Sequence, residues 1–284
     1  MTSTSSAVPT VFTAEGHELV LGDCINGMHA LPAASFDLAI VDPAYGASTD
    51  RKWGIPADHG LHGFGGKWAQ AAHHWDRLDN VDEFNNILTW LDQLRRLVKP
   101  SGSIWIHSTY HNSGFVNVGC QLLGLEIINE VVWYKRNAFP NLAKRRLTAS
   151  HETLLWVHTG SPKHRQYRFN YDAVKAADFV GDSLKAPGKQ LRTVWDIPNN
   201  KDPNERAFGS HPTQKPLRIT ERLFLISGAP GGRVLVPFLG SGTDAVAATK
   251  FGMTVLGFEN ELEYFAIACQ RLKAQLAEPR LEGL

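Results

Sequence analysis

The sequence predicts an α/β protein built on a mostly parallel, Rossmann-like sheet that is circularly permuted. Short apolar runs alternate along the chain with amphipathic segments of helical period, which is typical of parallel α/β folds. A glycine-rich loop at residues 240–243 stands between one such strand and a helix. Only 25 residues follow Glu259, at the end of the next strand, so the remaining strands must come from the N-terminal half.

Each element has its own local signal. Apolar runs that end at Gly, Pro or acidic residues predict strands, and apolar residues three or four apart predict helices. The helix expected at 81–98, for example, places apolar residues from Phe84 to Leu97 on one face and ends at Lys99-Pro100. The expected order is a loose tail at 1–16, strands at 17–21, 36–41, 103–107, 127–134, 153–158, 233–236 and 254–258, and helices at 25–31, 81–98, 115–123, 218–227, 243–252 and from 261.

Length and composition fit a single domain, residues 1–284, because 43% of the residues are hydrophobic and can form a sizeable core. No apolar run approaches the roughly 20 residues needed to cross a bilayer, and the first residues lack a basic stretch followed by an apolar core. We therefore expect a soluble, cytoplasmic protein with no membrane partner. Cys24, Cys120 and Cys269 form no CxxC pair and are expected to be buried free thiols.

Residues 46–80 show little periodicity and contain six glycines. The histidines His59, His62, His73 and His74 also fall in this segment. A metal site is disfavoured because no Cys or Glu-x-x-His partner completes a ligand set. We predict an active-site loop here and no bound metal.

The strand expected at 36–41 delivers Asp42-Pro43-Ala44-Tyr45 to its carboxyl end, where open α/β sheets bind ligands. A carboxylate and a backbone carbonyl, spaced by a proline of fixed φ, can accept both hydrogens of a planar amino group while an aromatic ring stacks on its face. These residues therefore predict a pocket for the exocyclic amine of a nucleobase. The alternative interpretation is an ordinary Pro turn after a strand.

The glycine loop predicts an adenosine-containing cofactor. Residues 240–245 fit G-x-G-x-x-A, and Glu259 follows Gly240 by 19 residues, where an acid can hold ribose hydroxyls. A kinase-type phosphate loop is disfavoured because no Gly-Lys-Ser/Thr follows the glycines. A nicotinamide dehydrogenase is disfavoured because too few residues remain for a second mononucleotide-binding half. The permuted order should place this loop and Asp42 at the carboxyl ends of adjacent strands.

Residues 136–210 form the least regular and most basic region. They contain 13 Lys and Arg against 7 Asp and Glu, a balance of 13 − 7 = +6 within a chain of net charge +1. Aromatic residues are interleaved with these charges, which suits phosphate neutralisation combined with base stacking. A solvated basic face is the alternative interpretation. These aromatic residues are Phe139, Tyr167, Phe169, Tyr171 and Trp195.

Asp42-Pro43-Ala44-Tyr45 resembles the Asp-Pro-Pro-Tyr signature of amino-group DNA methyltransferases, with Ala44 in place of the second proline. The chain order of amine pocket, basic region and glycine loop is similar to the beta class of that family over nearly the whole sequence. The resemblance implies a seven-stranded methyltransferase sheet, S-adenosylmethionine as cofactor, DNA as substrate and a target-recognition region at 136–210.

The resemblance also assigns a cofactor site. Residues 211–216, His-Pro-Thr-Gln-Lys-Pro, resemble the family's element beside the methionine portion, residues 22–24 its adenine-contacting turn, and residues 257–259 its ribose-binding strand end. The family commonly has an acid facing the cofactor's amino-acid end, but Val236-Pro237-Phe238 supplies none here. Affinity is therefore expected to depend more on Asp42, Thr213 and Lys215. The implied cofactor-binding residues are Asp23, Cys24, Asp42, His211, Thr213, Lys215, Phe238, Gly240, Ser241, Gly242, Thr243 and Glu259.

Residues 133–156 resemble adenine-specific members of that class. The implied reaction is transfer of a methyl group to the N6 amine of an adenine rotated out of the duplex. Asp42 and Pro43 would accept the hydrogens of the amine, and Tyr45 would stack on the base. The expected DNA contacts are Arg136, Asn137, Lys144, Arg145 and Arg146.

Two alternatives to adenine methylation stay open. Methylation of the N4 amine of cytosine would use the same pocket, but such relatives often have Ser in place of the first Asp. A non-catalytic, cofactor-sensing DNA-binding module is the second alternative, suggested by Val236 and Ala44. A homodimer and a cognate restriction endonuclease are further partners that the resemblance leaves open.

Overall fold

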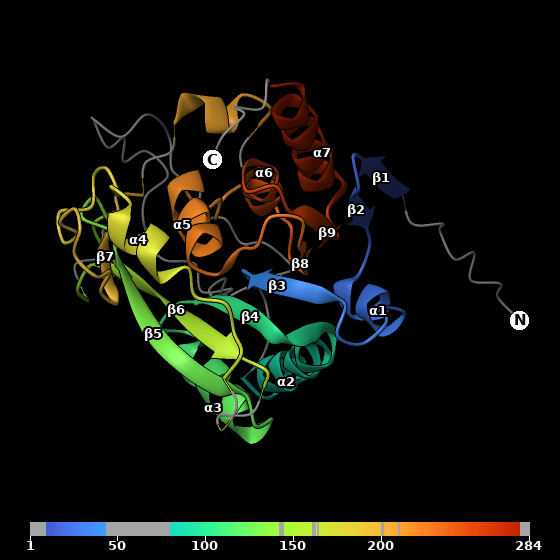
Figure 1. Ribbon diagram of the computed structural model, residues 1–284, viewed down its shortest axis with the longest axis horizontal. Helices are drawn as coiled ribbons and strands as arrows, with labels where there is room; N and C mark the ends of the chain where they lie inside the picture. Colours follow the sequence, from blue (N-terminus) through green and yellow to red (C-terminus); the bar gives the residue numbers. More distant parts are fainter. Residues whose placement is uncertain are drawn as a thin grey trace, which may run out of the picture.

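The computed structural model describes residues 10–43, 80–141, 145–160, 163, 165–199, 202–209 and 211–278, and one sheet of nine strands lies at its centre (Figure 1). The strands are β1 Thr10–Ala14, β2 His17–Leu21, β3 Phe36–Val41, β4 Val98–Ser108, β5 Glu126–Tyr134, β6 His151–His158, β7 Val194–Asp196, β8 Arg233–Val236 and β9 Thr254–Glu259. Their order in the sheet is β1-β2-β9-β8-β3-β4-β6-β5-β7. Five of the eight neighbouring pairs are parallel, so the sheet is mostly parallel as predicted.

Helices cover both faces of the sheet (Figure 1). They are α1 Cys24–His29, α2 Asn80–Leu97, α3 Ser113–Leu122, α4 Tyr171–Ala176, α5 Leu217–Ser227, α6 Thr243–Lys250 and α7 Leu262–Ala277, with a 3-10 turn η2 at Pro203–Arg206. None of the described helices is long and apolar enough to cross a membrane.

The central strand β3 is apolar from Leu38 to Val41 because both of its faces are buried there. Leu38 and Ile40 pack in the core beneath α5, α6 and α7, whereas Ala39 and Val41 pack in the core beneath α1, α2 and α3. Successive side chains of a strand point to opposite faces, and both faces of this strand are covered. The apolar run therefore ends where the strand leaves the sheet, and Asp42 follows there.

The predicted permutation is confirmed. Strand β8 pairs in parallel with both β3 and β9, and β2 pairs with β9 on its other side. N-terminal strands thus complete the sheet begun by the C-terminal ones. As a result Asp42, after β3, and the residues after β8 lie at the carboxyl ends of adjacent parallel strands.

Two strands add to the seven that were predicted, and the expected loose tail is wrong for residues 10–14. Strand β1 forms a hairpin with β2 in which Ala14 pairs with His17. The two residues between them, Glu15 and Gly16, have φ of 47° and 84°, the signs that a tight hairpin turn requires. Strand β7 forms inside the irregular basic region and pairs with β5.

Other predictions fall partly or wholly outside the described residues. Only residue 80 of the expected loop at 46–80 is described, and it begins α2; the four histidines of that loop lie outside the described residues. Cys24 and Cys120 are buried free thiols as expected, and Cys269 is a free, half-buried thiol.

Candidate active site

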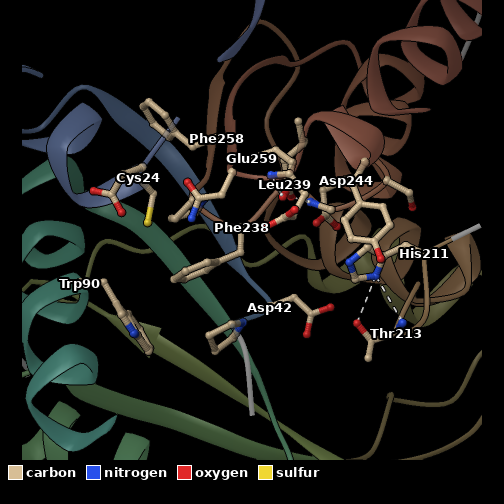
Figure 2. Close-up of a pocket in the computed structure, with 18 of the residues that line it drawn as sticks. Cys24, Asp42, Trp90, His211, Thr213, Phe238, Leu239, Asp244, Phe258 and Glu259 are labelled. Carbon is tan, nitrogen blue, oxygen red and sulfur yellow. Dashed lines mark hydrogen bonds between the residues drawn. The ribbon is translucent and has the colours of Figure 1, made fainter. Parts of the chain in front are cut away.

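A cavity of about 280 Å³ opens at the carboxyl ends of β3, β8 and β9 (Figure 2). It draws residues from the start of α1, the middle of α2, the segment before α5 and the loop before α6. All the predicted cofactor residues except Gly242 line it. The fold therefore gathers around one space side chains as far apart in the chain as Asp23 and Tyr264.

The two glycines of the loop have different tasks. Gly240 has φ of 53°, and a Cβ atom there would point toward His211, 3.8 Å away, across the cavity wall. Gly242 has φ of 79°, and a Cβ atom there would lie 2.8 Å from the Cβ of Ala268 on α7. Gly240 thus serves the left-handed turn of the loop, whereas Gly242 also lets α6 and α7 pack closely.

Glu259 closes one end of the cavity. Its carboxylate accepts hydrogen bonds from the backbone N–H of Gly240 at 2.7 Å and of Glu261 at 2.9 Å. Burial raises its pKa, and these two backbone donors oppose that shift. The carboxylate oxygens retain lone pairs that can accept the two hydroxyls of a ribose.

An apolar slot lies beside Glu259. The rings of Phe238 and Trp90 meet edge to face with centroids 6.2 Å apart, and Phe258 lines the same region (Figure 2). Asp23 caps α1 by accepting a hydrogen bond from the backbone N–H of Asn26. Burial raises the pKa of the Cys24 thiol to about 12, so this cysteine stays protonated and is no nucleophile. The slot suits a planar aromatic base.

The other end of the cavity is a buried cluster of charges. Lys215 Nζ lies 2.9 Å from both carboxylate oxygens of Asp42 and 3.6 Å from the carboxylate of Glu152. Lys135 Nζ lies 2.9 Å from the other oxygen of Glu152. Two carboxylates and two ammonium groups thus alternate, which keeps this partly desolvated cluster neutral overall.

The pKa shifts follow from that arrangement. Burial alone would lower the pKa of Lys215, but the charges of Asp42 and Glu152 outweigh it and raise the pKa. Burial would raise the pKa of Glu152, but Lys215 and Lys135 hold it below its usual range. Both groups therefore stay charged at neutral pH, and the ammonium of Lys215 keeps a fixed place beside Asp42.

Comparison with known proteins identifies the family of this chain. The sequence matches the family described as DNA methylase over residues 36–270. The chain belongs to the DNA methylase family. It is 33% identical to the type II methyltransferase M2.DpnII of Streptococcus pneumoniae, over 90% of each chain. It is also 33% identical to the type II methyltransferase M2.LlaDCHI of Lactococcus lactis subsp. cremoris, over 92% of this chain and 91% of that one.

Solved structures agree with this fold. The PvuII DNA methyltransferase, described as cytosine-N4-specific, superposes with a TM-score of 0.69 at 16% identity, over 91% of this chain and 87% of that one. The M1.HpyAVI–SAM complex superposes with a TM-score of 0.59 at 21% identity, over 89% and 98% of the two chains. The predicted methyltransferase architecture is therefore confirmed.

The cofactor of this methylase is S-adenosylmethionine, and the cavity fits it. The apolar slot matches the adenine, and the Glu259 carboxylate matches the ribose hydroxyls. The charged end matches a zwitterionic amino acid. There, His211 Nδ1 lies 3.3 Å from the backbone nitrogen and 3.2 Å from the hydroxyl of Thr213, and its ring packs against Tyr264 with centroids 4.2 Å apart.

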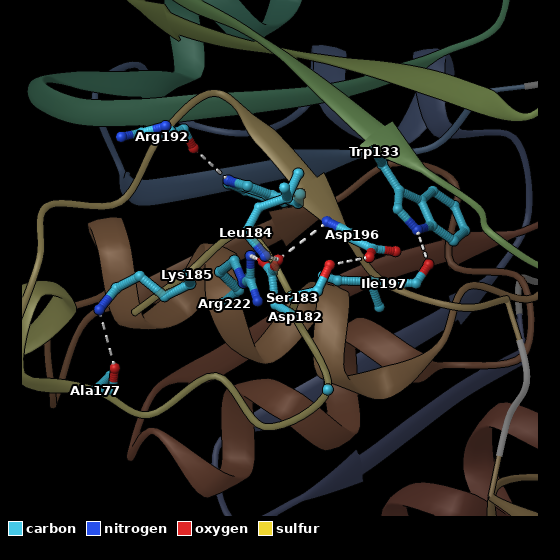
Figure 3. A network of polar contacts seen from close by, with 12 residues as sticks. Trp133, Ala177, Asp182, Ser183, Leu184, Lys185, Arg192, Asp196, Ile197 and Arg222 are labelled. Atoms are coloured by element: carbon cyan, nitrogen blue, oxygen red, sulfur yellow. Dashed lines mark hydrogen bonds and ion pairs between the residues drawn. The ribbon is translucent and has the colours of Figure 1, made fainter. Parts of the chain in front are cut away.

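Of the residues expected to bind DNA, Arg136 and Asn137 form hydrogen bonds within the protein. Arg136 bonds Asp196 Oδ1 at 2.8 Å and the carbonyl of Gly181, and Asn137 accepts a hydrogen bond from the backbone N–H of Asn199. Asp196 in turn belongs to the polar network drawn in Figure 3. Arg136 therefore ties β7 to the end of β5. The role in DNA binding stays a prediction for these residues.

Arg145 and Arg146 are exposed at the edge of the sheet that carries Asp42. Arg146 donates a hydrogen bond to the hydroxyl of Tyr110, at the end of β4, over 2.9 Å. Lys144 lies outside the described residues, as do Ala44 and Tyr45. The stacking role of Tyr45 therefore stays a prediction.

Several cavity residues of the methylase were missed in the sequence. Trp90 and Tyr264 were seen only as helix residues, since nothing in a helical pattern tells which apolar side chain faces a ligand. Asp244 was missed because its neighbours in the glycine-loop motif received the functional roles. Glu152, which does not line the cavity but pairs with Lys215, was missed in the same way. Acids inside an otherwise apolar helix or at the start of a strand were the signal that could have found them.

Proposed function

We propose that this methylase transfers a methyl group to the N6 amine of an adenine that is rotated out of duplex DNA. The observation that carries the proposal is the placement of Asp42 and Pro43. Both line the cofactor cavity directly after β3, and Lys215 fixes the Asp42 carboxylate in one orientation. An amine that reaches this carboxylate therefore lies next to the charged end of the cavity.

The proposed reaction needs two hydrogen-bond acceptors from the protein and a methyl donor. S-adenosylmethionine supplies an electrophilic methyl group on its sulfonium. The Asp42 carboxylate and the Pro43 carbonyl accept the two hydrogens of the amine, which directs the nitrogen lone pair toward that methyl group. After transfer the nitrogen loses one proton, and the Asp42 carboxylate accepts it. No covalent enzyme intermediate is required, in keeping with the protonated thiol of Cys24.

Adenine is favoured over cytosine by the sequence around the pocket. Asp42 stands where N4-cytosine enzymes often have Ser, and residues 133–156 resemble adenine-specific members. The likeness to the cytosine-N4-specific PvuII enzyme is one of fold, at 16% identity. Rotating the base out of the stack costs a few kcal/mol, which contacts from the exposed Arg145 and Arg146 to the DNA backbone would help to offset. A homodimer and a cognate restriction endonuclease stay predictions.

The test is transfer of labelled methyl from S-adenosylmethionine to unmethylated genomic DNA, followed by nucleoside analysis. We expect the label in N6-methyladenine. Label in N4-methylcytosine would overturn the choice of base, and DNA binding without any label would favour the non-catalytic alternative.

A pair of variants ties the reaction to Asp42. Asp42→Asn should abolish transfer while the variant still binds cofactor, because the amide keeps the shape but loses the charge and one acceptor. Asp37→Asn is the matched control, since Asp37 lies at the opposite end of β3, where it pairs with Lys99 at 2.7 Å. That variant should methylate DNA at the wild-type rate. Full activity of Asp42→Asn would end the proposal.

A further inference from the structure

Asp244 is a buried acid that none of the roles assigned so far uses. It is the second residue of α6, directly after the glycine loop, and is 8% exposed. Its side chain lines the same cavity as Asp42, as Figure 2 shows. A carboxylate this deeply buried normally has a cationic partner.

The cations near Asp244 are engaged elsewhere. Lys215 forms its ion pairs with Asp42 and Glu152. Arg271, on α7, donates to the carbonyl and hydroxyl of Ser241 and to the hydroxyl of Thr243, at 2.8 to 3.0 Å. Neither cation forms an ion pair with Asp244 within the part of the chain that the structure describes.

The surroundings of Asp244 act on its charge in opposite directions. Burial raises its pKa to about 7, and the Asp42 carboxylate adds to that effect. The hydroxyl of Thr220 on α5, the Lys215 ammonium and the Arg271 guanidinium oppose it. With a pKa of about 7, Asp244 is therefore close to half protonated at neutral pH.

The remaining partner must come from the ligand. Glu259 and the apolar slot account for the adenosine part of S-adenosylmethionine, so its amino-acid part must extend toward the end of the cavity formed by Thr213, Lys215 and Asp244. The α-ammonium group there has three N–H donors, whereas the sulfonium has none. The last residue of β8, Val236, offers no charge, and both carboxylate oxygens of Asp42 already contact Lys215. Asp244 on α6 is therefore the acid left to bind the ammonium group.

We propose that the Asp244 carboxylate binds the α-ammonium group of S-adenosylmethionine and is the residue that selects ligands carrying this zwitterionic amino-acid end. The proposal rests on the cofactor and is independent of which base is methylated. Its failure would therefore leave the proposed reaction on adenine standing.

The test measures binding to the full chain by calorimetry, with three ligands that share adenosine. S-adenosylmethionine and S-adenosylhomocysteine carry the amino-acid end, and 5′-methylthioadenosine lacks it. Asp244→Asn should weaken the binding of S-adenosylmethionine and S-adenosylhomocysteine by about 10- to 100-fold, as expected for the loss of a charge-assisted hydrogen bond. The affinity for 5′-methylthioadenosine should stay unchanged. Glu259→Gln is the matched control and should weaken all three, because all three carry the ribose.

Proton release gives a second readout. A bound ammonium ionises Asp244, so affinity for S-adenosylhomocysteine should rise about tenfold between pH 6 and pH 8, and the binding enthalpy at pH 6 should depend on the buffer. Asp244→Asn should lose both effects. The same variant without ligand should unfold at a higher temperature than wild type at pH 8, because it no longer buries a charge.

Two outcomes of the binding measurements would overturn the proposal. One is an equal loss of all three ligands in Asp244→Asn, which would indicate a general distortion of the cavity. The other is an unchanged affinity for S-adenosylhomocysteine with its pH dependence retained. A lower unfolding temperature of the unliganded variant at pH 8 would assign Asp244 to stability instead.

Discussion

Lys215 Nζ lies 2.9 Å from both carboxylate oxygens of Asp42, although 173 residues separate the two in the chain. Lys215 was predicted to bind the cofactor. It does line the cavity, but its ammonium bonds the proposed catalytic acid and is 7% exposed. The segment before α5 therefore fixes the orientation and charge of a residue that β3 delivers.

Replacing Lys215 should slow methylation strongly. Lys215→Met leaves Asp42 and Glu152 as buried acids with one cation fewer. Breaking a buried ion pair in this way lowers the free energy of unfolding by about 3–5 kcal/mol. We expect the methylation rate at pH 7 to fall by about 100-fold or more and to recover partly toward pH 9, where both acids ionise even without the lysine.

The pH–rate profile of single turnovers measures this effect. Lys250→Met is the control, since Lys250 pairs with Glu221 on the surface, and it should keep the wild-type profile. A uniform loss of rate at every pH in Lys215→Met would argue against a role for the ammonium in holding Asp42 ionised.

His107 should make the protein sensitive to acid. It lies fully buried at the end of β4, and burial lowers its pKa to about 4, with Lys215 adding to the shift and Asp42 and Glu152 opposing it. The unfolded chain binds the proton near pH 6.5, so stability from this residue is complete above pH 6.5 and falls as the pH drops to 4. The loss amounts to about 3 kcal/mol.

Denaturant unfolding at pH 7 and pH 4.5 can isolate this contribution. His107→Gln should lose less stability than wild type between these two values, whereas His29→Gln, at an exposed position on α1, should behave like wild type. An identical loss in wild type and His107→Gln would show that another group causes the acid sensitivity.

The sequence was most informative where local pattern and chemistry agree. The run 38–41, which Asp42 follows, is apolar because both faces of β3 are covered, and the glycine loop needed a strand before it and a helix after it. What stayed hidden were pairings that local pattern does not encode, such as Lys215 with Asp42. Arg136 was expected to bind DNA, but its partner Asp196 is 60 residues away and became visible only through the pairing of β5 with β7.

Arg145 and Arg136 should therefore respond differently to replacement. Arg145→Ala should weaken DNA binding about equally for all sequences and reduce the slope of log affinity against log salt by about 0.9, as expected for one lost phosphate contact. Arg136→Ala should mainly lower stability, by about 1 kcal/mol, because it removes the bonds to Asp196 and Gly181.

Fluorescence anisotropy at several salt concentrations and thermal unfolding separate the two effects. Arg95→Ala is the control for both, since Arg95 pairs with Asp92 on the outside of α2. An unchanged salt slope in Arg145→Ala would remove this arginine from the DNA interface. A reduced salt slope in a fully stable Arg136→Ala variant would show that Arg136 contacts DNA.

The buried ion pair between Arg222 and Asp182 should hold the basic region against α5 (Figure 3). The two side chains are 3% and 1% exposed, and their charged atoms lie 2.7 Å apart. The guanidinium also lies over the rings of Phe179 and Trp195, 4.0 and 4.8 Å from their centroids.

Arg222→Met leaves the Asp182 charge buried and should lower the free energy of unfolding by about 3–5 kcal/mol. The double variant, which also carries Asp182→Asn, should regain part of that stability. Arg165→Met, which breaks the more exposed pair with Glu126, should cost less than about 1 kcal/mol. Denaturant unfolding of the four proteins gives these values. The amide oxygen in Asp182→Asn can still accept from the backbone N–H groups of Leu184 and Asp196. A double variant less stable than Arg222→Met would therefore contradict the view that the unpaired charge of Asp182 causes the loss.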